Sequence, residues 1–359
     1  MPRFLMLCSV VALMLAACGG TVTITLPQVI VDNGPARAEP VRTATPAAPT
    51  HASRIPASKS QAKPAASRKP KVPAKKAPVF AADAQQPLGY ERLFSPQPHA
   101  FRYSVKGEPT RRGTYSERFE LRNGECGGSD CGNPWYRTEI RERVETIRAR
   151  VGRDIWYGWS FYNATLSSAP PETALRVVLG QWKIGGDQPA VFRIIQTGLG
   201  EGNWTGCDPA VCNRSGDRSL DVVVDLDDMA TANRWGKKQN FGQICKLFSL
   251  DANRWKWTDI VVNTNFGAAG NGYLRIWVNG ELRCDYHGSL VSNAGAKGDG
   301  AGPSHRRGIF VSSTKGWAQH RGKAPKPTMV VFYDEFAVGG TRAEVDTQFR
   351  AANGQPPLD

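Results

Sequence analysis

Charged and amide side chains recur at every second residue in two short segments of this chain. The first reads YRTEIR at residues 136–141, and the second reads QWK at residues 181–183. Alternate residues of a β-strand point to the same face, so Arg137, Glu139 and Arg141 would form one row. Gln181 and Lys183 would form a second row. Such rows are costly to bury, and they predict the floor of a groove that binds an anionic, hydroxyl-rich polymer.

The elements that would carry these rows read as β-strands. Short runs rich in Val, Ile, Tyr, Trp and Phe alternate with Gly, Asn, Asp and Pro clusters, and Asn279-Gly280 is typical of a type I′ hairpin turn. We therefore expect one all-β domain over residues 87–345, a concanavalin-like jelly-roll sandwich of two antiparallel sheets. The main predicted strands are 154–162, 175–183, 190–195, 220–225, 257–263, 272–280 and 328–334.

The first 86 residues do not read as globular. Residues 1–17 have an early arginine and an apolar run too short to span a membrane, which is typical of an export signal. The run ends in small residues before Cys18, and this resembles a lipoprotein signal, so we expect lipid on Cys18 and an outer-membrane location in a Gram-negative bacterium. The alternative is an ordinary signal peptide. Residues 18–86 are rich in Pro, Ala and Lys and predict a disordered tether, and residues 346–359 a C-terminal tail.

Much of the positive charge lies outside the predicted domain. The first 85 residues hold 11 Lys and Arg against 3 Asp and Glu, so they carry +8 of the net charge of +14. A basic tether extends and solvates itself, and it can also adhere to anionic envelope polymers. Nothing beyond this charge indicates a nucleic-acid partner, and we expect none.

The cysteines of the exported part are even in number, which predicts disulfides. Spacing pairs Cys126 with Cys131 and Cys207 with Cys212 in small loops, and leaves Cys245 to pair with Cys284. The alternative is a zinc site, which would need clustered histidine or cysteine ligands, and the small loops have no neighbouring histidine.

Several motifs together resemble the jelly-roll polysaccharide lyases, in particular the heparin lyase I and glucuronan lyase family. The segment RTEIR at 137–141 resembles that family's Arg-Ser/Thr-Glu-Leu-Arg strand, and Gln181-Trp182-Lys183 its Gln-x-His strand. Similar motifs follow at 257–262 (WTDIVV), 274–280 (LRIWVNG), 306–310 (RRGIF) and 332–336 (FYDEF). The resemblance covers roughly residues 110–340.

The resemblance implies β-elimination on a uronate-containing acidic polysaccharide, with no required cofactor. This reaction must neutralise the substrate carboxylate and stabilise the enolate-like dianion that forms. Gln181 would then face the carboxylate, with Lys183 and Arg141 as further catalytic residues. The residues implied to bind substrate or order the site are Arg137, Glu139, Arg306, Trp182 and Tyr136.

The chain departs from the family where the catalytic phenol would be. Phe310 and Ser304 stand where the family has tyrosines, and Lys183 stands where it often has histidine. A lysine flanked by guanidiniums is a candidate base because like charges lower its pKa. The other candidates are Tyr136, Tyr157, Tyr286, His287 and His305. Strand alternation predicts that His305 points to the face opposite Arg306.

Three functions stay open at this point. The first is a lyase, and the second is a non-catalytic carbohydrate-binding envelope lipoprotein on the same fold. The third is a glycoside hydrolase, which would need a pair of carboxylates on one strand face that the sequence does not show. A structural Ca²⁺ is a further expectation, with metal ligands among Asp225, Asp227, Asp228, Asp334 and Glu335. We expect a monomer.

Overall fold

The computed structural model describes residues 87–358 apart from 94–95, 134, 169–174, 186–187, 198–220, 233–241, 293–301 and 313. The chain divides into two compact units, residues 1–73 and 74–359, and every described residue belongs to the second. The predicted signal, Cys18 and the whole predicted tether lie outside the described residues. Within the described part, no helix is both long and apolar enough to cross a membrane.

Two antiparallel sheets of seven strands form a jelly-roll sandwich, which confirms the predicted fold class. Sheet A has the order β1 (Tyr90–Leu93), β4 (Tyr136–Glu142), β13 (Ser304–Ser312), β6 (Arg176–Lys183), β7 (Ala190–Thr197), β8 (Asp221–Asp225), β9 (Gln243–Ser249). Sheet B has the order β12 (Glu281–His287), β11 (Tyr273–Val278), β10 (Trp257–Thr264), β5 (Ile155–Asn163), β14 (Met329–Gly339), β3 (Glu117–Leu121), β2 (Phe101–Tyr103).

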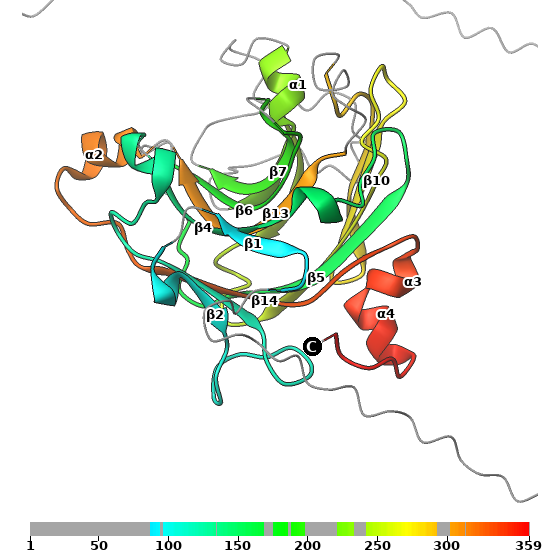
Figure 1. Ribbon diagram of the computed structural model, residues 1–359, viewed down its shortest axis with the longest axis horizontal. Helices are drawn as coiled ribbons and strands as arrows, with labels where there is room; N and C mark the ends of the chain where they lie inside the picture. The colour runs from blue at the N-terminus through cyan, green and yellow to red at the C-terminus, as the bar shows by residue number, and fades with distance from the viewer. Residues whose placement is uncertain are drawn as a thin grey trace, which may run out of the picture. The chain divides into compact units, whose positions relative to one another are not determined.

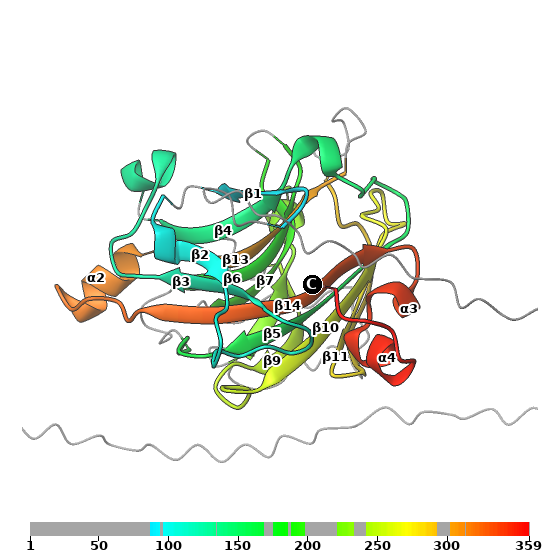
Figure 2. The same ribbon diagram turned by 60° about the horizontal axis from the view of Figure 1, so that its bottom comes forward.

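Sheet A is curved, and its concave side faces away from sheet B (Figure 1). The described helices are short and lie at the margins of the sheets (Figure 2). They are α1 (Asp227–Ala232), α2 (Lys315–Arg321), α3 (Arg342–Val345) and α4 (Thr347–Ala352), with 3-10 turns η1 (Pro98–Ala100), η2 (Gly128–Gly132) and η3 (Val144–Thr146).

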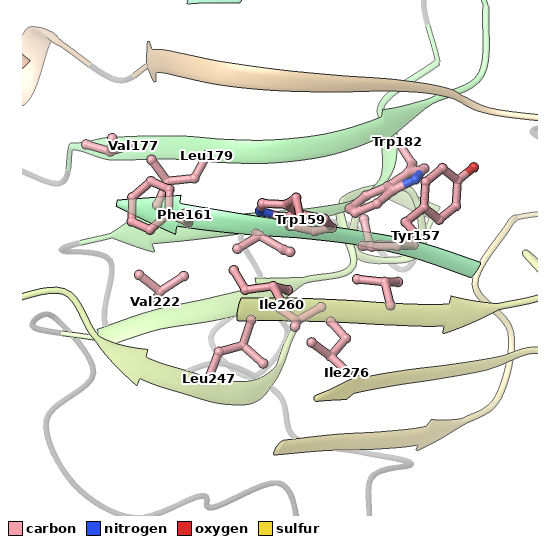
Figure 3. Close-up of a cluster of buried hydrophobic side chains, with 14 of the residues drawn as sticks. Tyr157, Trp159, Phe161, Val177, Leu179, Trp182, Val222, Leu247, Ile260 and Ile276 are labelled. Carbon is pink, nitrogen blue, oxygen red and sulfur yellow. The ribbon is translucent and has the colours of Figure 1, made fainter. Parts of the chain in front are cut away.

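The core lies between the two sheets. Trp159, Phe161 and Ile260 of sheet B meet Leu179 and Trp182 of sheet A (Figure 3). In sheet B these positions alternate with outward-facing residues. In β6 an irregularity near residues 178–180 lets both Leu179 and Trp182 face the core although they are three residues apart. A second, smaller apolar cluster lies on the opposite face of sheet A and consists of Val178, Ile195, Val223 and Phe310.

Two of the three predicted disulfides are confirmed. Cys126 and Cys131 close a small loop with Cα atoms 5.1 Å apart. Cys245 of β9 and Cys284 of β12 link sheet A to sheet B across a Cα distance of 5.4 Å. The third predicted pair, Cys207 with Cys212, lies outside the described residues.

The packed fold extends past residue 345, where the sequence predicted a tail. Arg350 of α4 is buried, and its guanidinium donates to the carboxylate of Glu335 in β14. The backbone N–H of Leu358 donates to the same carboxylate at 2.9 Å. The boundary was misplaced because residues 346–358 have few apolar side chains, and it is a buried ion pair that holds them.

Candidate active site

A row of polar side chains crosses the concave face of sheet A at right angles to the strands. Strand register places Arg141 opposite Arg306 and Arg306 opposite Gln181. The same row continues from Gln181 to Arg193 and from Arg193 to Asp225. Three segments far apart in the sequence therefore bring the predicted residues Arg141, Gln181 and Arg306 side by side.

Glu139 connects this row to Arg137, which lies on the same face. The Gln181 side-chain amide donates to one oxygen of Glu139 at 2.7 Å, and Arg137 donates to the other at 3.0 Å. Arg137 also makes a double hydrogen bond to Asp130, at 2.7 and 3.1 Å. Asp130 belongs to η2, in the loop that the Cys126–Cys131 disulfide closes. Glu139 thus fixes both Gln181 and Arg137.

Arg306 differs from the other arginines of this face. Among the described residues it has no hydrogen-bonding or ion-pair partner, and its Nε is buried without an acceptor. Burial lowers the pKa of Arg306 to about 10; Glu139 opposes this shift, while Arg137, Arg141 and Arg193 add to it. A half-buried guanidinium without an anion is a ready site for a carboxylate, which would offset its desolvation.

Lys183 and Arg141 flank this centre. Lys183 follows Gln181 by two residues on the same face of β6, and its Nζ donates to the carbonyl of Gln188. Arg141 pairs with Glu91 of β1 at 2.6 Å, with both side chains about two-fifths exposed (41% and 37%). The Arg141–Glu91 pair is open to solvent, so it holds Arg141 only weakly.

Two predicted substrate-binding residues do not join this face. Trp182 is fully buried in the core, where its ring stacks on Phe192 at 4.3 Å. Tyr136 packs against the same core, and Lys326 lies 4.5 Å above its ring. Both side chains alternate with the polar row and therefore point toward sheet B. The roles predicted for the site residues stay predictions.

The alternative bases lie away from the polar row as well. His305 points into the core, as strand alternation predicted, and Tyr90 bonds its Nδ1 at 3.1 Å. Tyr157 is also buried in the core, whereas Tyr286 and His287 belong to β12 of sheet B. The structure describes all nine tyrosines of the chain, and none of them lies in the row around Gln181.

Tyrosines instead gather around a cavity of about 650 Å³ on the other side of sheet A. It is bordered by β1, β3 and β14, and Tyr90, Tyr103, Tyr115 and Tyr333 line it. Burial raises the pKa of Tyr90 and of Tyr333 far above the usual phenol value. These phenols are therefore poor bases near neutral pH.

The sequence interpretation missed the cations at the far end of the row. Arg193 of β7 pairs with Asp227 at 2.6 Å, and Arg176 of β6 pairs with the buried Asp225. Arg193 is the one charged residue in the run AVFRII at 190–195. A lone charge inside an apolar strand is the signal that could have identified it.

The carboxylates named as calcium candidates are engaged by protein donors. Asp225 and Asp227 pair with arginines, Asp228 accepts from Ser292, and Asp334 accepts from backbone N–H groups of residues 111, 112 and 335. In the described part of the chain, no group of three or more His, Cys, Asp or Glu side chains is arranged to hold a metal ion. The structural Ca²⁺ therefore stays a prediction.

Comparisons with solved structures return other jelly-roll enzymes at low similarity. An endo-β-1,4-glucuronan lyase from the fungus Trichoderma reesei has a TM-score of 0.44 at 15% identity, over 72% of this chain and 94% of the other. A family 7 alginate lyase has a TM-score of 0.41 at 13% identity, over 69% and 88%. A marine family 7 alginate lyase from Zobellia galactanivorans has a TM-score of 0.37 at 15% identity, over 66% and 83%.

These scores are too low to assign a substrate. The comparison with curated proteins gives no match. The sequence profile described as "Polysaccharide lyase" matches residues 87–337, which include the whole polar row and both sheets except the last two residues of β14. The chain therefore belongs to the polysaccharide lyase family.

Proposed function

We propose that this protein cleaves a uronate-containing acidic polysaccharide by β-elimination on the concave face of sheet A. The observation that carries the proposal is Arg306, a half-buried guanidinium without a partner among the described residues, in register with Gln181. A substrate carboxylate at Arg306 would supply the missing anion.

The chemistry of the reaction suits this arrangement. Removal of the proton next to a uronate carboxylate places a second negative charge on that group, and donors aimed at it lower the barrier. Arg306 would hold the carboxylate, and Gln181 lies beside it on the next strand. Glu139 keeps the Gln181 amide oriented through a 2.7 Å hydrogen bond, so little reorganisation is needed when the charge develops.

We assign proton abstraction to Lys183. It lies on the same strand face as Gln181, and Ser304 and Phe310 leave no phenol on the neighbouring β13. To act as a base, Lys183 must be neutral. It would take the C5 proton, the C4–O bond would break as the C4–C5 double bond forms, and the resulting ammonium would return the proton to the leaving glycosidic oxygen. Lys183→Gln should therefore abolish product formation while polymer binding persists.

The test is the ultraviolet absorbance of the unsaturated uronate product across a panel of acidic polysaccharides. Arg306→Gln should reduce turnover by about a hundredfold or more, because one charge-stabilising donor is lost. The matched control is Arg275→Gln, which removes an ion-paired arginine from β11 of sheet B and should leave turnover unchanged. Equal activity of the two variants would refute the role of Arg306.

A second candidate function is binding without cleavage. The observation that favours it is the absence of all nine tyrosines from the polar row. Isothermal titration with the same panel separates the two functions. Binding that depends on Arg306, with no product from any polymer, would replace the lyase proposal by this one.

A further inference from the structure

The ion pairs on the concave face limit how much negative charge a polymer can place there. We infer that the site accepts a polymer in which single uronates are separated by neutral sugars, rather than a polymer charged at every sugar. This inference rests on the proposed function, because it specifies the substrate of the same site.

Most cations of this face already have carboxylate partners within the chain. Arg137 pairs with Asp130 and Glu139, at 2.7 and 3.0 Å. Arg193 pairs with Asp227 at 2.6 Å, and Arg176 pairs with Asp225. Each of these carboxylates is less than one-tenth exposed, so each depends on its arginine for compensation (Asp130, Glu139, Asp225, Asp227).

A polyanion would have to compete with these internal partners. Drawing an arginine toward the polymer leaves a buried carboxylate unpaired, which is strongly unfavourable. The uncompensated carboxylate would also repel the polymer. The paired arginines are therefore poor sites for further uronates, although their number alone would suggest a strongly basic groove.

Arg306 is the exception in the described part of this face. It lacks a partner among the described residues, and Glu139 is the carboxylate that most strongly opposes the lowering of its pKa. Lys183, which donates to the Gln188 carbonyl, is assigned to proton transfer at the same sugar. The site thus compensates one carboxylate fully, and sugars on either side of it meet charge-balanced pairs.

The first experiment compares two polymers with the full-length protein. The probes are deacylated gellan, which has one glucuronate in a repeat of otherwise neutral sugars, and polygalacturonate, which is charged at every sugar. We expect gellan to bind more tightly at physiological salt. Affinity falls as salt rises, and the plot of log affinity against log salt should have a slope of about −1 for gellan, since about one counterion is released per cation engaged.

The second experiment frees a cation. Glu91→Gln removes the exposed partner of Arg141, and we expect it to strengthen polygalacturonate binding and to steepen its salt slope by about one. Asp227→Asn should do the same through Arg193, provided that its melting temperature shows a folded protein. The matched control is Glu281→Gln, which frees Arg283 on β12 of sheet B and should change neither quantity.

The outcomes separate this inference from the proposed function. Tighter wild-type binding of polygalacturonate, with a slope of about −3 or steeper, would overturn the sparse-charge inference and leave the lyase proposal intact. An unchanged slope in both Glu91→Gln and Asp227→Asn would overturn it as well. Failure to bind or cleave any acidic polymer would overturn the proposed function, and the inference with it.

Discussion

Phe310 lies on the concave face where related lyases carry a tyrosine. The Arg137 guanidinium lies 4.1 Å above its ring, and Trp135 meets the ring edge-on at 6.1 Å. Phe310 is four positions along β13 from Arg306, which corresponds to about 13 Å of extended strand. A phenol here is therefore remote from the carboxylate that Arg306 would hold.

From this we predict that Phe310→Tyr leaves turnover within about twofold of the wild type, a barrier change of less than about 0.5 kcal/mol. Initial rates on the most active polymer of the panel measure it. A tenfold gain would show that a phenol at this position takes part in proton transfer, and the assignment to Lys183 would then fail.

Protonation of the buried His305 opposes folding. Burial lowers the pKa of His305 well below that of a free imidazole, and the charge of Arg307 adds to the shift. The unfolded chain therefore takes up a proton as pH falls through about 6.5, whereas the folded protein does not. Stability is present above this pH and is lost below it.

We predict that His305→Phe reduces this pH dependence. Between pH 6.5 and 5, the stability advantage of the wild type over the variant should shrink by about 1.4 kcal/mol per pH unit, the value for one proton. Urea unfolding of both proteins at several pH values gives the difference directly. Parallel curves for the two proteins would show that His305 is charged in the folded state.

Strand alternation sufficed to place Arg137, Glu139 and Arg141 on one face, and to turn His305 away from it. It did not show that Trp182 would lie in the core, because the sequence does not tell which face of the strand packs against the partner sheet. It also could not show that Arg306 lacks a partner. That property depends on every carboxylate that folding brings near, and Asp130, Asp225 and Asp227 are distant in sequence.

At the scale of elements, strand pairing in sheet A creates the site. β4, β13 and β6 are neighbours in the sheet although their residues lie near 140, 306 and 180. Gly308 permits the close pairing of β13 with β4: its φ is +129°, and a Cβ there would lie 2.3 Å from the Thr138 carbonyl oxygen. Close pairing with β4 therefore explains why the RRGIF motif has a glycine at this position, and the local sequence alone does not reveal this.

The disulfide between β9 and β12 fastens sheet A to sheet B. It closes a segment with a sequence separation of 39, against 5 for Cys126–Cys131. A longer loop loses more chain entropy when it is closed in the unfolded state. We predict that replacing Cys245 and Cys284 by alanine costs about 4 kcal/mol, roughly twice the cost of replacing Cys126 and Cys131.

Chemical denaturation of the two double variants under oxidising conditions tests this order. The Cys126/Cys131 variant has a second expected effect, since its loop carries Asp130, the partner of Arg137. Its turnover should fall even under conditions in which the variant is fully folded. If the Cys126/Cys131 variant were the less stable of the two, the length of the closed loop would not determine how much each disulfide stabilises the protein.

At the scale of the whole domain, the two faces of the sandwich have separate tasks. The concave face of sheet A carries the polar row, and β14 and β5 of sheet B pack against the C-terminal helices (Figure 2). Period-2 patterning predicted the sandwich because it depends on apolar residues within each strand. The same pattern did not predict the C-terminal end of the domain, because an ion pair, and not an apolar face, attaches α4 to β14.

Glu335 is the anchor of that C-terminal segment. It is 3% exposed, has a φ of +54° although it is not glycine, and its carboxylate accepts from Arg112, Arg350 and the N–H of Leu358. A side chain in this backbone conformation persists when its surroundings hold it there. Arg350 also donates to the carbonyl of Pro356, so one guanidinium joins β14, α4 and the last residues.

The final prediction compares two arginines of this segment. Arg350→Leu should destabilise the protein by about 3 kcal/mol, the low end for breaking a buried pair, because Glu335 then keeps Arg112 as its charged partner. Arg342→Leu removes a partly exposed pair with Asp346 and should cost about 1 kcal/mol, including its contact with the Trp277 ring. Thermal unfolding measures both, and at about 2–4 °C per kcal/mol the difference is well resolved. A loss of less than about 1 kcal/mol in Arg350→Leu would show that its ion pair with Glu335 is not what holds residues 346–358 on the domain.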